Sequence, residues 1–142
     1  MTARTALIVG LGRSGVSAAR HLAARGWQLA VTDSRADPPG RAELERIAPR
    51  ATCRFGGFDL GLLGAAALVV ASPGVSLAEP LLREAAARGI EIVGDIELFA
   101  REGRVRGPQV PVTAITGTNG KSTVTTLVGE MVQAAAYASI DG

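Results

Sequence analysis

Residues 6–15 read ALIVGLGRSG, and this stretch decides the fold class. Four consecutive apolar residues, 6–9, are typical of a short strand that is buried on both faces. Gly10 then opens a Gly-x-Gly-x-x-Gly pattern that Gly12 and Gly15 complete. A glycine loop between a strand and a helix allows a tight turn, close approach of the backbone to a diphosphate, and close packing of helix on strand. We therefore expect phosphates to bind at the N-terminus of the following helix.

The segments that follow repeat this strand–helix order. Helical spacing predicts a helix over residues 13–25, which Gly26 ends, and apolar runs predict strands over 29–31 and 67–71. Between them, residues 41–48 read as a short helix. A helix over 78–88, a strand over 90–93 and a helix over 96–101, capped by Asp95, come next. The alternation predicts an α/β fold, a Rossmann-like parallel sheet with helices on both faces.

Two further segments follow strands of this sheet, at the ends where open α/β sheets bind ligands. Asp33 closes the second strand, 18 residues beyond Gly15, which is near the spacing of an acid that reads a ribose. Ser72, Pro73 and Gly74 close the strand at 67–71, where a simple turn is an equal alternative. The pattern suits NAD and UDP-sugars alike, and a glycine turn kept only for packing stays open.

The composition changes near residue 103, where glycine, proline and arginine gather over residues 103–111. We expect a linker there, between a first domain over 1–102 and a second domain over 112–142. A strand over 112–115 and a helix over 121–135 would begin this second α/β domain. One strand and one helix cannot bury their own apolar faces, so we expect the second domain to be incomplete.

A second glycine loop, TGTNGKST, occupies residues 116–123 between this strand and helix. It resembles a P-loop, in which glycines expose backbone N–H groups, Lys121 reaches the β- and γ-phosphates, and Ser122 ligates Mg²⁺. The strict eight-residue P-loop pattern fails, because Ile115 stands where its first glycine belongs. Lys121 is nevertheless the only lysine among 15 basic residues, at the position where a compact ammonium fits against phosphates.

Composition excludes several classes of protein. The net charge is +2 without a basic run, so nucleic-acid binding has no support. Cys53 is the only cysteine and His21 the only histidine, so we expect a structural thiol and no disulfide. The chain lacks an apolar stretch of membrane-spanning length and a signal-peptide pattern. We expect a cytoplasmic monomer that does not bind membranes.

Four motifs together resemble the Mur ligases, and among them the members that add D-glutamate. They are GLGRSG at 10–15, ASPG at 71–74, GDIELF at 94–99 and TGTNGKSTVTTL at 116–127. Folylpolyglutamate synthases share the last motif, but they lack a preceding domain of this kind. The resemblance implies a Rossmann-like domain that binds the UDP substrate, followed by the start of a central P-loop ATPase domain.

The resemblance also implies a reaction and its site residues. ATP, with Mg²⁺, would phosphorylate the carboxylate of UDP-N-acetylmuramoyl-L-alanine, and the amine of D-glutamate would attack the acyl phosphate during peptidoglycan precursor synthesis. The residues implied for the UDP substrate are Gly12, Arg13, Ser14, Gly15, Asp33, Ser34, Arg35, Ser72, Pro73 and Gly74. Those implied for ATP are Gly117, Thr118, Asn119, Gly120, Lys121, Ser122 and Thr123, with Lys121 catalytic and Ser122 at the magnesium ion.

Two other functions stay open at this point. An NAD(P)-dependent oxidoreductase domain would explain the first loop, but it leaves the second loop without a role. A nucleotide-binding module that is inactive in isolation would explain both loops. The family's remaining catalytic residues have no match in this chain, so we expect the 142-residue chain alone to lack ligase activity.

Overall fold

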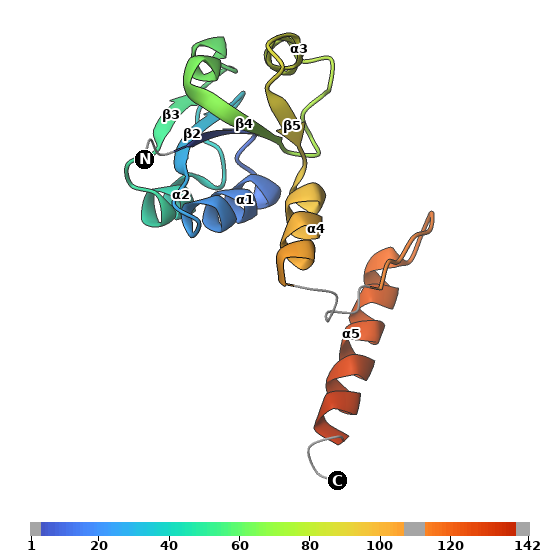
Figure 1. Ribbon diagram of the computed structural model, residues 1–142. Helices are drawn as coiled ribbons and strands as arrows, with labels where there is room; N and C mark the ends of the chain where they lie inside the picture. Colours follow the sequence, from blue (N-terminus) through green and yellow to red (C-terminus); the bar gives the residue numbers. More distant parts are fainter. Residues whose placement is uncertain (1–3, 107–112, 139–142) are drawn as a thin grey trace. The chain divides into compact units, whose positions relative to one another are not determined.

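The computed structural model describes residues 4–106 and 113–138, which belong to two units, Met1–Arg106 and Gly107–Gly142. The first unit contains five parallel strands in the order β3-β2-β1-β4-β5 (Figure 1). They are β1 (Thr5–Val9), β2 (Gln28–Asp33), β3 (Thr52–Phe55), β4 (Ala66–Ala71) and β5 (Glu91–Val93). From β1 the chain first builds outward through β2 and β3, and then returns to place β4 on the other side of β1. The ends of β1 and β4 therefore form a topological switch point, where such sheets bind ligands.

Helices cover both faces of this sheet, which confirms the predicted α/β architecture. Figure 1 shows α1 (Arg13–Ala23) and α2 (Arg41–Ile47) on one side and α3 (Pro80–Ala87) on the other. The side chains of β1 alternate between the two cores: Ala6 and Ile8 pack with α1, whereas Leu7 and Val9 pack with α3. All four are fully buried, as expected for a central parallel strand.

Three elements differ from the sequence prediction. Strand β3 and the 3₁₀ helix η1 (Leu60–Ala65) were not expected. Strand β3 has only four residues at the edge of the sheet, and half of its side chains are exposed, so its apolar signal is weak. Helix α4 (Asp95–Arg106) continues five residues beyond its predicted end. Its Arg101 forms ion pairs with Glu97 and with Glu91 of β5, at 2.9 and 2.5 Å.

The second unit is described over residues 113–138 and contains helix α5 (Lys121–Ala138). Residues 113–115 form no strand, so the prediction of a strand at 112–115 is wrong over its described part. A strand needs a neighbour for its backbone hydrogen bonds, and the described residues of this unit provide none. Part of the predicted linker, residues 107–111, and residue 112 lie outside the described residues, while residues 103–106 belong to α4. Helix α5 exposes Val124, Leu127, Met131 and Val132.

Candidate functional site

A cleft of about 650 Å³ lies at the carboxyl ends of β1, β2 and β4. It is lined by Gly10, Gly12, Arg13, Ser14, Asp33, Ser34, Arg35, Phe58, Ser72, Pro73, Gly74, Val75, Ser76 and Glu79. All but one of these residues come from three segments that are far apart in the sequence: the segment after β1 with the start of α1, the loop after β2 and the loop after β4. Phe58, which follows β3, is the exception. The structure thus brings the three segments selected from the sequence into one cavity, at the switch point of the sheet.

The three glycines of the first loop have different structural reasons. Gly10 has a φ of +92°, a conformation that L-residues rarely adopt. A Cβ atom on Gly15 would lie 2.1 Å from the carbonyl oxygen of Gly10, so the turn leaves no room for a side chain. A Cβ atom on Gly12, by contrast, would meet no protein atom within 4 Å, and the backbone there is extended. Of these three glycines, only Gly12 could carry a side chain without a clash or backbone strain inside the protein. This fits a position where a ligand approaches the backbone closely.

The N-terminus of α1 faces the cleft and favours anions. Gly12 is its N-cap and supplies no capping side chain, so the first-turn N–H groups keep no intrahelical partner. The first turn carries no acidic residue, while Arg13 and Ser14 line the cleft. Unpaired N–H groups, the helix dipole and a guanidinium together create a positive region suited to a diphosphate.

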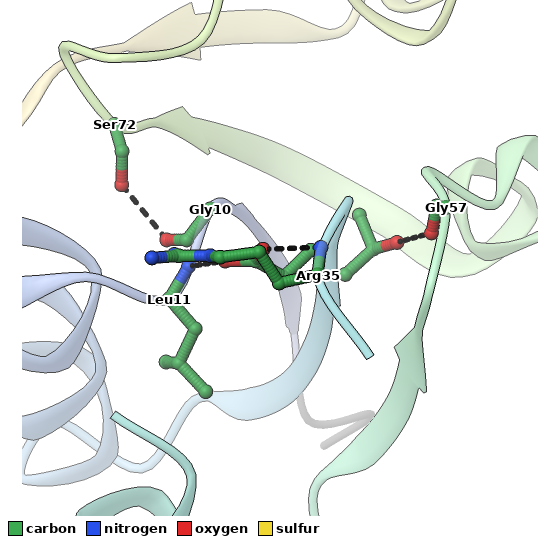
Figure 2. A network of polar contacts seen from close by, with 7 residues as sticks. Gly10, Leu11, Arg35, Gly57 and Ser72 are labelled. Carbon is green, nitrogen blue, oxygen red and sulfur yellow. Dashed lines mark hydrogen bonds and ion pairs between the residues drawn. The ribbon is translucent and has the colours of Figure 1, made fainter. Parts of the chain in front are cut away.

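Asp33 holds the first loop in place from the end of β2, through contacts with Leu11 and Arg35, which Figure 2 labels. Its carboxylate is buried and accepts the backbone N–H of Leu11 at 2.6 Å. The same carboxylate accepts the Nε and Nη2 of Arg35 at 2.8 and 2.6 Å, and the backbone N–H of Arg35 at 2.9 Å. These hydrogen bonds, led by the Arg35 side chain, lower the pKa of Asp33 from 3.8 to about 2. Asp33 is therefore ionised, and protein donors already occupy both of its oxygens.

Leu11 is fixed from its other side as well. Its carbonyl accepts the backbone N–H of Gly40 at 3.1 Å, and its side chain is fully buried. A Cβ atom on Gly40 would lie 2.4 Å from Val16, so this contact between the two loops also requires glycine. The loop after β1 is thus held in shape by the loop after β2, without help from a ligand.

The loop after β4 is tied to the glycine loop by a hydroxyl group. Ser72 Oγ donates to the carbonyl oxygen of Gly10 at 2.8 Å, as Figure 2 shows. The backbone N–H of Ser72 donates to Val9 O at 3.0 Å. These bonds keep Pro73 and Gly74 at the cleft wall.

The second glycine loop, at residues 116–123, directly precedes and opens the helix of the second unit. Gly117 and Gly120 have φ values of +156° and +76°, and α5 begins directly afterwards at Lys121. The Nζ of Lys121 donates to Gly117 O at 2.5 Å, so the ammonium lies over its own loop. Ser122 and Thr123 occupy the first turn of α5, a position at which helices in general favour anions.

Comparison with known proteins identifies the family. Residues 4–94 match the model of the Mur ligase MurD-like N-terminal domain. The chain belongs to the Mur ligases. It is 52% identical to the UDP-N-acetylmuramoylalanine–D-glutamate ligase of Nitrosococcus oceani over 133 residues, which cover 94% of the chain and 28% of the relative. It is 50% identical to the protein of the same name from Pseudomonas aeruginosa, over 91% of the chain and 28% of the relative. The chain therefore spans less than a third of these relatives' length.

Solved structures agree on the fold of this Mur ligase segment. A murein peptide ligase from Psychrobacter arcticus superposes with a TM-score of 0.66 at 22% identity, over 94% of this chain and 27% of its own. A pseudomurein peptide ligase type C from Methanothermus fervidus gives a TM-score of 0.59 at 24% identity, over 84% and 24%. At these identities the match supports the parallel α/β fold alone.

Sequence reasoning missed several residues of the cleft in this Mur ligase domain. Phe58, Val75, Ser76 and Glu79 line it, and none belongs to a recognised motif. Glu79 and Ser76 follow a strand end by a few residues, which was the available signal. Gly15 was assigned to the UDP substrate but does not line the cleft, because it faces Gly10 inside the turn.

A second cavity of about 710 Å³ lies at the amino ends of the strands, opposite the first cleft. Its lining includes Trp27, Thr5, Gln28 and Thr52, which stand at or just before the amino ends of strands. The first turn of the 3₁₀ helix η1 lines it at Gly61 and Leu62, but the Asp59 side chain already caps that turn by accepting the N–H of Gly61 at 2.8 Å. The smaller cleft, where the sheet's carboxyl ends and α1 converge, is therefore the better candidate for a nucleotide site.

Other residue classes offer no competing site in the described residues. No group of three or more His, Cys, Asp or Glu side chains there could hold a metal ion. Cys53 is a half-buried free thiol of β3, and burial raises its pKa, which opposes a nucleophilic role. Within residues 4–106 and 113–138, no helix is long and apolar enough to cross a membrane.

Proposed function

We propose that this chain is the front part of an ATP-dependent ligase that adds D-glutamate to UDP-N-acetylmuramoyl-L-alanine. The observation that carries the proposal is the meeting of nine family-implied residues in one cleft, at the switch point of a MurD-like domain. The names of the relatives give the substrates. The first unit binds the UDP substrate, and the second unit begins the ATP-binding domain.

The first unit would bind the substrate by its nucleotide end. The N-terminus of α1, with Gly12, Arg13 and Ser14, binds the diphosphate, and the extended backbone at Gly12 lets the phosphate approach closely. Ser34 and Arg35 lie beside it at the end of β2 and bind the uridine, with Asp33 as their anchor. Ser72, Pro73 and Gly74 form the far wall.

The second unit would bind ATP through residues 117–123. Its glycines turn the backbone toward phosphate, and the Lys121 ammonium would exchange Gly117 O for the β- and γ-phosphates. The Ser122 hydroxyl would supply one oxygen ligand to Mg²⁺. Magnesium sites of this kind have few protein ligands, and phosphate and water oxygens complete the coordination shell. Magnesium would offset the charge that develops on the transferred phosphoryl group.

The reaction proposed for these two candidate sites is the one that the family resemblance implies. The γ-phosphoryl group of ATP passes to the carboxylate of the UDP substrate, giving an acyl phosphate and ADP. The amine of D-glutamate attacks the acyl carbon, the amide forms, and inorganic phosphate leaves. Lys121 holds the phosphoryl group in position, and the first unit holds the acceptor by its UDP end.

An oxidoreductase domain that binds NAD is the second candidate function. In such a domain the acid at the end of β2 accepts hydrogen bonds from ribose hydroxyls. Here Asp33 already accepts from Leu11 and Arg35, which disfavours that role. Calorimetry on the 142-residue chain tests the choice: UDP and UDP-N-acetylmuramoyl-L-alanine should bind more tightly than NAD. Tighter binding of NAD than of UDP would overturn the proposal.

A further inference from the structure

The cleft of the first unit has two sides of opposite charge. The strand order places β2 on one side of β1 and β4 on the other. Beside β2 the charge of Arg35 is compensated by the ionised Asp33, while Arg13 and the N-terminus of α1 follow β1, so this side is positive on balance. Beyond β4, the only charged residue that lines the cleft is Glu79, and Ser76 lies beside it.

The Glu79 side chain lines the cleft, but its carboxylate makes no polar contact among the described residues that would stabilise the fold. Glu79 is the N-cap of α3, yet its side chain makes no capping hydrogen bond. Its backbone is fixed at both ends, because its N–H donates to Ser76 O at 3.0 Å and its carbonyl accepts from Arg83 N at 3.1 Å. Within residues 4–106, no hydrogen bond or ion pair engages the half-buried carboxylate.

A free carboxylate is unfavourable next to a diphosphate unless it binds something else. Two like charges repel, so Glu79 alone would weaken a ligand that ended at its second phosphate. A carboxylate accepts hydrogen bonds from hydroxyl and amide groups, and such bonds are stronger than those between neutral groups. Ser76 Oγ accepts the N–H of Ala78 at 3.2 Å, which leaves the hydroxyl proton to donate to a ligand.

We propose that Glu79, assisted by Ser76, determines specificity for the group attached to the far phosphate, a sugar that carries hydroxyl and amide donors. The inference rests on the proposed function, since it takes the nucleoside diphosphate to lie along β2 and β1. The strand order then directs the rest of the ligand toward β4. Glu79 raises the affinity for a ligand with hydrogen-bond donors at that point and lowers the affinity for a bare nucleoside diphosphate.

The cleft continues in the direction that this inference requires. A smaller hollow of about 320 Å³ shares Ser72, Pro73 and Val75 with it. Its other lining residues are Ala71, Leu77, Ile92, Val93 and Gly94, so it follows the sheet edge from β4 to β5. The chain thus provides room beyond Ser72 and Pro73, on the β4 side of the cleft, for a ligand longer than UDP.

A simpler role for Glu79 would be a favourable charge near the N-terminus of α3. A carboxylate there interacts with the helix dipole and contributes to stability whether or not a ligand binds. The two roles make different predictions. A helix charge changes the melting temperature alone, whereas a sugar-binding carboxylate changes the ratio of the affinities for two ligands.

Calorimetry on the 142-residue chain with UDP and with UDP-N-acetylmuramoyl-L-alanine separates them. For Glu79→Gln we expect UDP affinity to stay equal or rise slightly, while affinity for the sugar nucleotide falls roughly five- to tenfold. Ser76→Ala should reduce the sugar nucleotide's affinity by a smaller factor, about two- to threefold. Glu84→Gln, on the same helix but paired with Arg88 outside the cleft, is the matched control and should change neither affinity.

Two results would overturn the inference itself, and a third, distinguishable from them, would overturn the function beneath it. Glu79→Gln with a lower melting temperature but an unchanged affinity ratio would make Glu79 a helix charge. Equal affinity of the unsubstituted chain for both ligands would remove the sugar subsite while leaving the UDP site intact. Failure of UDP itself to bind would instead overturn the proposed function on which the inference rests.

Discussion

Replacing Asp33 with asparagine should destabilise the first unit by an amount that the structure allows us to estimate. Asparagine has the same shape, but its amide group would turn a donor toward the N–H groups of Leu11 and Arg35. Lowering the pKa of Asp33 from 3.8 to about 2 means that the ionised carboxylate gains about 2 to 3 kcal/mol from folding. We therefore expect Asp33→Asn to lower the free energy of unfolding by about 2 to 3 kcal/mol at pH 7.

The pH dependence of this loss distinguishes ionisation from packing. Because the pKa is lower in the folded state, the stabilisation is complete above the unfolded value of 3.8 and disappears as the pH falls toward 2. The difference between Asp33→Asn and the unsubstituted chain should thus be greatest above about pH 5 and shrink toward pH 2. Urea unfolding at several pH values measures it directly.

A matched control lies four residues further along the same loop. Asp37 is exposed and lies 3.9 Å from Arg41, so Asp37→Asn should change stability by less than about 0.5 kcal/mol. In thermal unfolding, Asp33→Asn should lower the midpoint by roughly 10 to 20 °C for a domain of this size. An Asp33→Asn chain as stable as the unsubstituted one at pH 7, or a difference that ignores pH, would refute the proposed anchoring role.

Three further predictions concern the two phosphate loops. Gly12→Ala should leave the melting temperature within a few degrees, because a Cβ atom there meets no protein atom, yet weaken UDP binding about tenfold or more; unchanged calorimetric affinity would contradict this. Gly15→Ala should instead lower the free energy of unfolding by about 1 to 3 kcal/mol or more, since its Cβ atom would clash with Gly10 O. Urea unfolding measures this, and an unchanged free energy of unfolding would contradict the prediction. In a ligase with a complete central domain, Lys121→Arg should reduce turnover on the order of 10² to 10³, nearly as much as Lys121→Ala, with UDP-substrate affinity unchanged; near-normal steady-state turnover of Lys121→Arg would show that the loop needs only a charge.

Much of the first unit could be predicted from local signals in the sequence. The run at 6–9 and the glycines after it predict both β1 and the turn into α1, because the apolar run and the glycine spacing are signals contained within ten consecutive residues. Strand β3 was missed since its pairing with β2, and not its own composition, makes it a strand. The prediction of a strand at 112–115 was wrong over residues 113–115 because an apolar run becomes a strand only beside a partner strand.

The candidate site shows the same division between local and distant information. Glycine spacing predicts which loop faces phosphate, but it does not reveal that Asp33 is used by Leu11 and Arg35 inside the protein. The sequence spacing of Asp33 is equally compatible with a ribose acceptor, and only the three-dimensional contacts distinguish the two roles. Glu79 was missed because its relation to the cleft depends on the order of strands in the sheet.

The most direct test of the account is where UDP-N-acetylmuramoyl-L-alanine binds on the 142-residue chain, measured by amide chemical-shift changes in NMR titrations. Trp27, the only tryptophan, lines the second cavity at the amino ends of the strands and supplies an internal reference signal. We predict saturable shifts at residues 12–14, Arg35 and residues 72–74, with the Trp27 indole N–H unchanged. Shifts centred on Trp27 and the amino ends of the strands, with the glycine loop unaffected, would contradict the account.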